Sequence, residues 1–241
     1  MNLSGKTVLI TGSGIRLGRV MALAIANAGG DVVLHYHSSR EPAENLQVEI
    51  EKLGRKAYLF QADLSDPQSA KNLIREISQA TALYGLVNSA SIFENLSLES
   101  TKIKDWQQHL QVNLTAPFLL SQTFASQLES QQEGRIVNIL DWRALRPGSD
   151  HFPYTISKAG LVALTRALAV SLAPNISVNG LAFGAILPPS DGGATEGILD
   201  NIPARRWADL DEVGQALVFL LDGPSYITGE IIHLDGGRHL I

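Results

Sequence analysis

The sequence predicts an α/β fold in which a mostly parallel, seven-stranded sheet is flanked by helices. Seven short runs rich in apolar and β-branched residues alternate with longer segments of helical pattern. Most of these runs are continuously apolar, which is typical of strands buried on both faces of a parallel sheet. Right-handed strand–helix–strand crossovers then give a doubly wound arrangement. The expected strands cover residues 7–11, 31–37, 56–62, 84–90, 134–140, 176–183 and 229–235.

Helical patterns fill most of the intervals between these strands. Pro67 follows Asp66 at a point where a helix begins, and there its missing N–H costs little. A Gly/Pro-rich interval from 184 to 203 is too long for an ordinary connection, so we expect a mobile substrate flap over 184–208. The whole chain, 1–241, is expected to form one domain. The expected helices cover residues 17–28, 41–53, 66–80, 102–130, 153–173 and 209–222.

Composition narrows the classes of function. The 241 residues carry a net charge of −5, which argues against nucleic acid or an anionic membrane as the main partner. The chain has no cysteine, and this excludes disulfides, thiolate catalysis and cysteine-ligated zinc. No secretory signal and no long uninterrupted apolar run is evident. We expect a cytoplasmic protein that acts on a small molecule without a metal.

The stretch "ITGSGIRLGR" at 10–19 has the pattern of a phosphate-binding loop. It follows the first expected strand and opens the first helix, where free backbone N–H groups attract phosphate. Gly12, Gly14 and Gly18 are spaced one residue wider than in the common dinucleotide fingerprint. The alternative is a tight turn that binds no ligand. The position of the loop favours a Rossmann-type dinucleotide site.

The end of the second strand indicates which dinucleotide binds. An NAD site needs a carboxylate there for the ribose diol, yet none occurs before Glu41. Ser38, Ser39 and Arg40 are instead suited to a phosphate dianion. Arg16, in the glycine-rich loop, is expected to close on the same phosphate from the other side. The sequence therefore predicts NADPH, the alternative being that both arginines are ordinary surface charges.

Tyr154 and Lys158, in "YTISK", are four residues apart at the start of an expected helix, so they share one face. A phenol is too weak an acid to work at neutral pH without help. A neighbouring ammonium, with the cationic oxidised nicotinamide, would bring the tyrosine pKa toward the working range. Such pairs also occur by chance on solvated helices.

Taken together, these motifs resemble the short-chain dehydrogenase/reductase family over essentially the whole chain. The further matching segments are "ADL" at 62–64, "NSAS" at 88–91, "VN" at 112–113 and "LDGG" at 234–237. The resemblance implies that Tyr154 is the acid, Asp63 lies beside the adenine, and Asn113 holds a relay water near Lys158. The cofactor-binding residues it implies are Gly12, Gly14, Ile15, Arg16, Leu17, Gly18, His37, Ser38, Ser39, Arg40, Asp63, Leu64, Asn88, Ser89, Ala90, Tyr154, Lys158, Gly184 and Ile186.

Asp141 departs from the family pattern, because a serine usually stands thirteen residues before the tyrosine. An anionic carboxylate would disfavour the oxyanion that develops from a ketone. Beside a C=N bond in a guanidine-like ring, the same group can accept from ring N–H groups or deliver a proton. This feature resembles the pteridine reductases and the bacterial dihydromonapterin reductases. The substrate-binding residues that this branch implies are Arg16, Ser91, Phe93, Asp141 and Tyr154, and Leu187 and Trp207 are further candidates for the pocket or flap.

Three functions remain open at this point. The first is an NADPH-dependent pteridine reductase in which Tyr154, Asp141, Lys158 and Asn113 are catalytic. The second is a generic carbonyl or 3-oxoacyl-thioester reductase, against which the missing serine argues. The third is a catalytically quiet NADPH-binding sensor. Members of the family are usually homotetramers, so Arg238 and His239 are expected to reach a neighbouring subunit.

Overall fold

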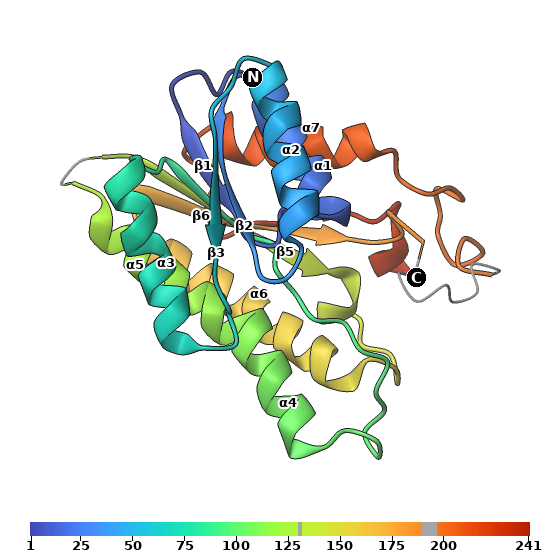
Figure 1. Cartoon of the computed structure of the whole chain (residues 1–241). Helices are drawn as coiled ribbons and strands as arrows, with labels where there is room; N and C mark the ends of the chain where they lie inside the picture. The colour runs from blue at the N-terminus through green and yellow to red at the C-terminus, as the bar shows by residue number, and fades with distance from the viewer. Residues whose placement is uncertain (130–131, 189–196) are drawn as a thin grey trace.

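The computed structural model describes residues 1–129, 132–188 and 197–241 (Figure 1). Seven parallel strands form one sheet in the order β3-β2-β1-β4-β5-β6-β7. The predicted α/β fold and each of the seven expected strands are confirmed. The strands are β1 (Thr7–Ile10), β2 (Asp31–Tyr36), β3 (Ala57–Gln61), β4 (Gly85–Asn88), β5 (Gly134–Asp141), β6 (Ile176–Phe183) and β7 (Ile231–Leu234).

The helices agree with expectation except between 102 and 130. At the start of α3, the Asp66 carboxylate accepts hydrogen bonds from the backbone N–H groups of Gln68 and Ser69, and Pro67 follows it as predicted. The helices are α1 (Arg16–Asn27), α2 (Arg40–Lys52), α3 (Pro67–Ala80), α4 (Ile103–Leu110), α5 (Ala116–Gln127), α6 (Phe152–Leu172) and α7 (Leu210–Asp222), with short turns η1 (Gln111–Thr115), η2 (Trp142–Ala144) and η3 (Arg238–Leu240).

The expected single helix over 102–130 is wrong. A π-helical turn, η1, separates α4 from α5, and α5 ends at Gln127. Residue 130, the end of the expected helix, lies outside the described residues. Pro117 contributes to the interruption, because it has no N–H to donate to the carbonyl of Asn113 four residues earlier. The π-helical turn includes Asn113, one of the predicted catalytic residues.

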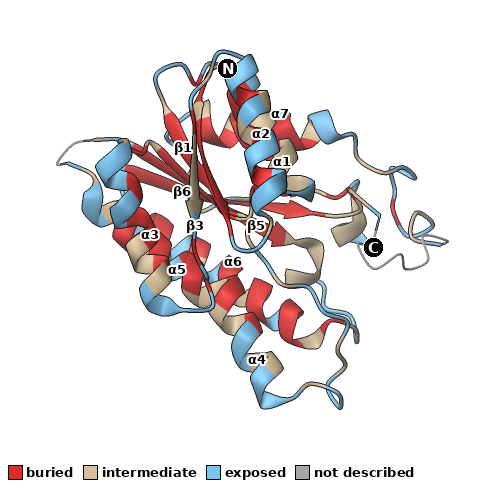
Figure 2. Ribbon diagram, viewed as in Figure 1, coloured by how far each residue is buried: buried red, intermediate tan, exposed pale blue. Residues whose placement is uncertain are grey.

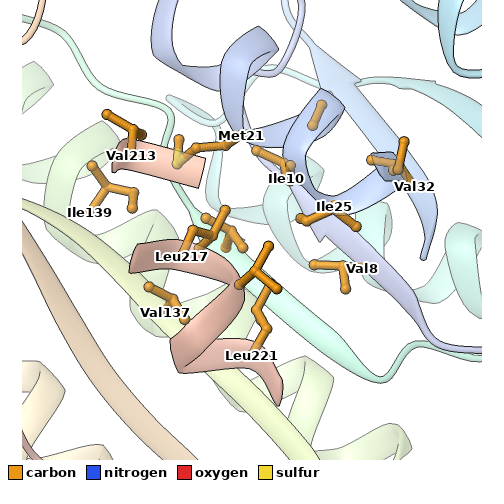
Figure 3. Packing of buried hydrophobic residues seen from close by; sticks show 14 of the residues in the cluster. Val8, Ile10, Met21, Ile25, Val32, Val137, Ile139, Val213, Leu217 and Leu221 are labelled. Carbon is orange, nitrogen blue, oxygen red and sulfur yellow. The ribbon is translucent and has the colours of Figure 1, made fainter. Parts of the chain in front are cut away.

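Two hydrophobic layers cover the two faces of the sheet; the inner strands are buried, and the edge strands β3 and β7 are mostly half-buried (Figure 2). In Figure 3, Met21 and Ile25 of α1 and Leu217 of α7 pack over Ile10 and Val137 of the sheet. Helices α3 and α5 pack on the opposite face. The continuous apolar runs in the sequence are explained by this burial from both sides.

The strand order reverses direction between β1 and β4, which pair although β2 and β3 intervene in sequence. In open α/β sheets, ligands bind at the carboxyl ends of the strands beside such a reversal. Helix α6 is long and apolar enough to cross a membrane by length and composition alone. It packs instead beside β5 and β6, and it carries Tyr154 and Lys158.

Candidate active site

A cavity of about 850 Å³ opens at the carboxyl ends of the strands. It extends from Ser38 and Ser39, after β2, to Tyr154 and Lys158 on α6. Most of the predicted site residues line it: Gly12, Ile15, Arg16, Leu17, Gly18, His37, Ser38, Ser39, Asp63, Leu64, Ser89, Ala90, Ser91, Phe93, Asp141, Tyr154, Lys158, Gly184, Ile186, Leu187 and Trp207. The predicted residues that do not line it are Gly14, Arg40, Asn88 and Asn113.

The glycine-rich loop is packed so closely that side chains are excluded from it. A Cβ atom at Gly18 would lie 2.1 Å from the backbone oxygen of Gly12. Gly12 has φ +66°, a value that favours glycine. Gly14 faces away from the cavity, toward the Ser39 hydroxyl. The loop thus brings its backbone and the N-terminus of α1 to the cavity wall, as a phosphate site requires.

The side chain of His35, for which the sequence predicted no role, holds this loop by a hydrogen bond. The Gly12 N–H donates to His35 Nδ1 over 3.1 Å, so the other ring nitrogen, Nε2, carries the proton and donates to the Ala62 carbonyl, also at 3.1 Å. Burial lowers the pKa of His35 to about 4 and keeps the ring neutral. A histidine inside an otherwise apolar strand was the available signal.

The two arginines expected to clamp one phosphate are not brought together. Arg40 is the first residue of α2, so its guanidinium pairs with Glu44 one turn along, at 2.8 Å, and its side chain is 73% exposed. Arg16 does line the cavity, and it donates to the Pro188 carbonyl over 2.8 Å. Of the two arginines, therefore, only Arg16 shares the cavity lining with Ser38 and Ser39.

The segment after β4 is held by a threonine that the sequence analysis did not single out for this purpose. Thr11 Oγ1 accepts hydrogen bonds from the N–H groups of Ser89 and Ala90, each at 2.9 Å. The Asn88 amide turns away from the cavity and donates to Asn138 Oδ1 over 2.8 Å. Asn88 thus lies behind the cavity wall that Ser89 and Ala90 form.

The Asn113 side chain is fully occupied by protein partners. Its Oδ1 accepts from Ser91 Oγ (3.1 Å) and the Ile92 N–H (2.9 Å). Its Nδ2 donates to the Ile92 carbonyl and to Ser157 Oγ, each at 3.0 Å. These four bonds satisfy the amide, so its side chain is unsuited to hold the predicted relay water. Pro117 has no N–H to donate to the Asn113 carbonyl, and the relay role of Asn113 stays a prediction.

Tyr154 and Asp141 meet in the cavity. Tyr154 Oη donates to Asp141 Oδ2 over 3.1 Å, and Asp141 Oδ1 accepts from the Arg143 N–H over 2.8 Å. Lys158 is buried and donates to the Ile139 carbonyl over 2.7 Å. Its Nζ lies 5.7 Å from the centre of the Tyr154 ring. Strand β5 ends at Asp141 and α6 begins at Phe152, which brings the acid, the phenol and the ammonium to one place.

Burial dominates the proton equilibria of these groups. It raises the pKa of Asp141 and lowers the pKa of Lys158 to about 8. Burial, followed by the charge of Asp141, raises the pKa of Tyr154 well above its ordinary value. Without a bound nicotinamide, Lys158 therefore does not bring the tyrosine into the working range as expected. The phenol stays protonated, and the raised pKa of Asp141 favours a carboxyl that can carry a proton.

Phe93 forms an aromatic wall of the cavity next to Tyr154 and Asp141, the acid pair. Its ring stacks on His151 with centroids 3.8 Å apart, and it meets the Tyr154 ring edge-to-face at 4.7 Å. Phe93 is 47% exposed and lines the cavity, so it is not a core residue. Leu187 and Trp207, from the described ends of the predicted flap, also line the cavity. The two ends are joined by a hydrogen bond from the Ala208 N–H to the Ala185 carbonyl. Residues 189–196 of that flap lie outside the described chain.

Arg238 lines the cavity of its own chain, and its expected reach toward a neighbouring subunit stays a prediction. Its guanidinium carbon lies 4.1 Å from the centre of the Trp142 ring. His239 turns away from the cavity and pairs with Asp235 at 2.8 Å. In the sequence, the only hint of the Arg238 contact was the aromatic Trp142 directly after Asp141. Within the described residues, no cluster of histidine and carboxylate side chains could hold a metal.

A glycine-rich loop at the reversal of a doubly wound sheet, facing a buried tyrosine and lysine, defines a dinucleotide-dependent oxidoreductase. The chain belongs to the short-chain dehydrogenase/reductase family. Residues 12–239 match the family described as enoyl-(acyl carrier protein) reductase. The prediction of an enzyme of this family is confirmed.

The chain is similar to relatives with different substrates. It is 34% identical to the 2-dehydro-3-deoxy-D-gluconate 5-dehydrogenase of Bacillus subtilis, with 98% of this chain and 95% of that protein covered. It is 35% identical to the 3-oxoacyl-[acyl-carrier-protein] reductase FabG of Aquifex aeolicus, covering 98% of each. A crystal structure of FolM alternative dihydrofolate reductase 1 from Brucella canis, complexed with NADP, superposes with TM-score 0.91 at 33% identity, covering 100% of this chain and 97% of that one.

Proposed function

We propose that this protein is an NADPH-dependent reductase that transfers a hydride to a C=N bond of a pterin-like substrate. The observation that carries the proposal is the carboxylate of Asp141, 3.1 Å from Tyr154 Oη inside the cavity. A carboxyl group in this position suits a nitrogen heterocycle better than a ketone. The similarity to FolM, whose name denotes a dihydrofolate reductase, supports the same substrate class.

The residues present fit NADPH. The cradle around Gly12 and Gly18 admits a phosphate against backbone N–H groups, because no Cβ atom intrudes. Arg16, Ser38 and Ser39 line the end where a ribose 2′-phosphate would lie, and β2 ends without a carboxylate. When bound, the reduced nicotinamide supplies the hydride. The protein's own residues hold the substrate and move the proton.

The proton reaches the substrate nitrogen from the Tyr154–Asp141 pair. Burial favours a protonated carboxyl at Asp141, which can donate to a ring nitrogen, and it keeps the Tyr154 hydroxyl protonated as well. Lys158 faces the Tyr154 ring and stabilises the phenolate left by proton transfer. Lys158 then passes a proton to the Tyr154 phenolate, and a water on the Asn113 carbonyl replaces the proton that Lys158 has lost. Phe93 provides the flat surface on which the heterocycle stacks.

The second candidate is a carbonyl or 3-oxoacyl-thioester reductase, which the similarity to FabG favours. On that substrate, Asp141 stands where negative charge develops and would oppose the reaction. The third candidate, a quiet NADPH-binding sensor, gives no reason for a buried tyrosine, lysine and carboxyl to converge.

Steady-state NADPH oxidation with a 7,8-dihydropterin, with acetoacetyl thioester and with a simple ketone, run side by side, separates the three functions. We expect the dihydropterin to have the highest kcat/KM. A higher value with the thioester would overturn the proposal in favour of the second function. Tight NADPH binding with no turnover of any substrate would favour the sensor.

We further propose a cytoplasmic homotetramer. Apolar side chains project from the outer faces of α5 and α6: Phe118 and Ile156 are each 39% exposed, and Val170 is 83% exposed. If a second copy covered these side chains, their burial would stabilise an assembly. Multi-angle light scattering measures the state directly, and a mass near 26.0 kDa, that of one chain, would exclude it.

A further inference from the structure

Two guanidinium groups stand at the substrate end of the cavity. Arg143 follows Asp141 by two residues, and its guanidinium carbon lies 4.9 Å from the centre of the Trp142 ring. The guanidinium carbon of Arg238 lies 4.1 Å from the same ring. Turns η2 and η3, which carry these residues, pack together, and all three side chains line the cavity.

The charge of this pair is only partly balanced. Arg143 donates to Asp150 over 3.1 Å and its Nη1 lies 3.9 Å from Asp141 Oδ1, but its buried Nε has no hydrogen-bond partner among the described residues. Among the described side chains, no carboxylate pairs with the guanidinium of Arg238. Burial and the neighbouring charge of Arg143 lower the pKa of Arg238, so the two cations repel each other. A partly buried cation without a partner is costly unless a ligand supplies one.

The stacking on Trp142 leaves the N–H groups of Arg238 available to a ligand, and Arg143 offers those that it does not donate to Asp150. A guanidinium that stacks on an indole uses only the face of its plane for the contact. Its N–H groups point outward within that plane, where they can donate to an anion. Arg143 also lies 5.8 Å from the centre of the Phe93 ring, beside the proposed place of the heterocycle. The cofactor phosphates belong to the opposite end, at Gly12, Ser38 and Ser39, so they do not account for this pair.

We propose that Arg143 and Arg238 form an anion-binding end of the substrate cavity, so that the reducible ring carries a tail with a carboxylate or a phosphate. This inference rests on the proposed function for the identity of the ring, but not for the charge of the tail. It adds a specificity determinant that the acid pair and the aromatic wall do not provide. Planar carboxylates and phosphates share the chemistry that a guanidinium fork recognises.

The test compares three probes that share one ring. They are a 7,8-dihydropterin with a neutral hydroxymethyl tail, the same compound esterified to phosphate at that hydroxyl, and 7,8-dihydrofolate, whose tail ends in carboxylates. The measurement is the ratio of kcat/KM for each anionic probe to kcat/KM for the neutral one. We expect R238Q to lower this ratio by about 10- to 100-fold, because hydrogen bonds to charged groups are lost. The probe with the larger loss identifies carboxylate or phosphate.

R238K keeps the charge without the fork and should retain part of the preference, which also covers the case in which R238Q folds poorly. Arg75 is exposed on α3, outside the cavity, so R75Q is the matched control and should keep the wild-type ratio. A wild-type ratio in both R238Q and R238K would overturn the inference while leaving the reductase proposal intact.

If no dihydropterin is reduced, the proposed function fails, and the inference is then judged on ketones. The same ratio is measured with the 3-oxobutanoate anion against its neutral ethyl ester. A lower ratio in R238Q supports the anion site, and an unchanged ratio refutes it.

Discussion

Tyr154 Oη donates a hydrogen bond to Asp141 Oδ2 across 3.1 Å, at a point where Tyr154 is buried and the Asp141 side chain is only 16% exposed. The hydrogen bond ties the titration of each group to that of the other. It also fixes the side chain that differs from the usual family pattern directly against the residue that acts as the acid.

Replacing Asp141 by asparagine should lower kcat for the dihydropterin by about 100-fold or more, because a positioned acid is lost. Asp141→Ser should lose pterin activity as well and gain activity on a simple ketone. Steady-state kinetics measure both changes. Asp211, exposed at the start of α7, provides the control D211N. Unimpaired pterin turnover in D141N would show that Asp141 has no catalytic role.

Tyr154→Phe should abolish turnover and keep NADPH affinity within about threefold of the wild type, since the phenol is at the reacting end of the cavity and removing an acid acts on the chemical step. Fluorescence titration with NADPH and steady-state kinetics separate the two effects. Y226F, at a fully exposed tyrosine, is the control. Retained turnover in Y154F would assign the proton to another group.

The pH dependence of the reduction should follow the buried acid. Burial raises the pKa of Asp141, so its protonated form persists above the ordinary carboxyl range and is lost as the pH rises through the raised value. In wild type, kcat/KM for the dihydropterin should therefore fall with increasing pH on that limb. D141N should remove this limb from the profile. A limb that remains in D141N belongs to a different ionisation.

Arg16→Ala should lower the ratio of kcat/KM with NADPH to that with NADH by about tenfold or more, because a charge-assisted contact with the 2′-phosphate is lost. Arg40→Ala is the informative companion, since its guanidinium is engaged with Glu44 outside the cavity. We expect less than about a twofold change from R40A alone. An unchanged ratio in the double variant would remove the case for NADPH selectivity. An equal effect of both single changes would mean that Arg40 leaves Glu44 when the cofactor binds.

Stability should decrease as the pH falls from about 6.5 toward about 4 because of His35. Its pKa is lowered from 6.5 to about 4 in the fold, so the unfolded chain binds the extra proton within this interval. The loss is on the order of 3 kcal/mol when the interval is fully crossed. Thermal unfolding at several pH values should show a weaker pH dependence in H35Q. A pH dependence in H35Q equal to that of the wild type would contradict the assignment to His35.

The fold and most of the cavity wall were predictable because both depend on local pattern. Continuous apolar runs identify buried parallel strands, and the glycines and the Tyr154–Lys158 spacing reflect short-range geometry. Long-range contacts were not predictable in the same way. Arg40 looked available until the start of α2 set it one turn from Glu44, and Arg238 became a cavity residue only once η3 packed on η2. The support of Gly12 by His35 likewise depends on how neighbouring strands pair.

The four bonds of the Asn113 amide have a mechanical consequence. They join the segment that bears Phe93 to Ser157, next to the helical turn that bears Tyr154, so the stacking surface and the acid shift as one rigid unit. Reshaping the pocket from that side would disturb both at once. Adaptation to a bulkier or differently shaped compound is therefore easiest on the facing wall, where Leu187, Trp207 and Arg238 are free of that linkage.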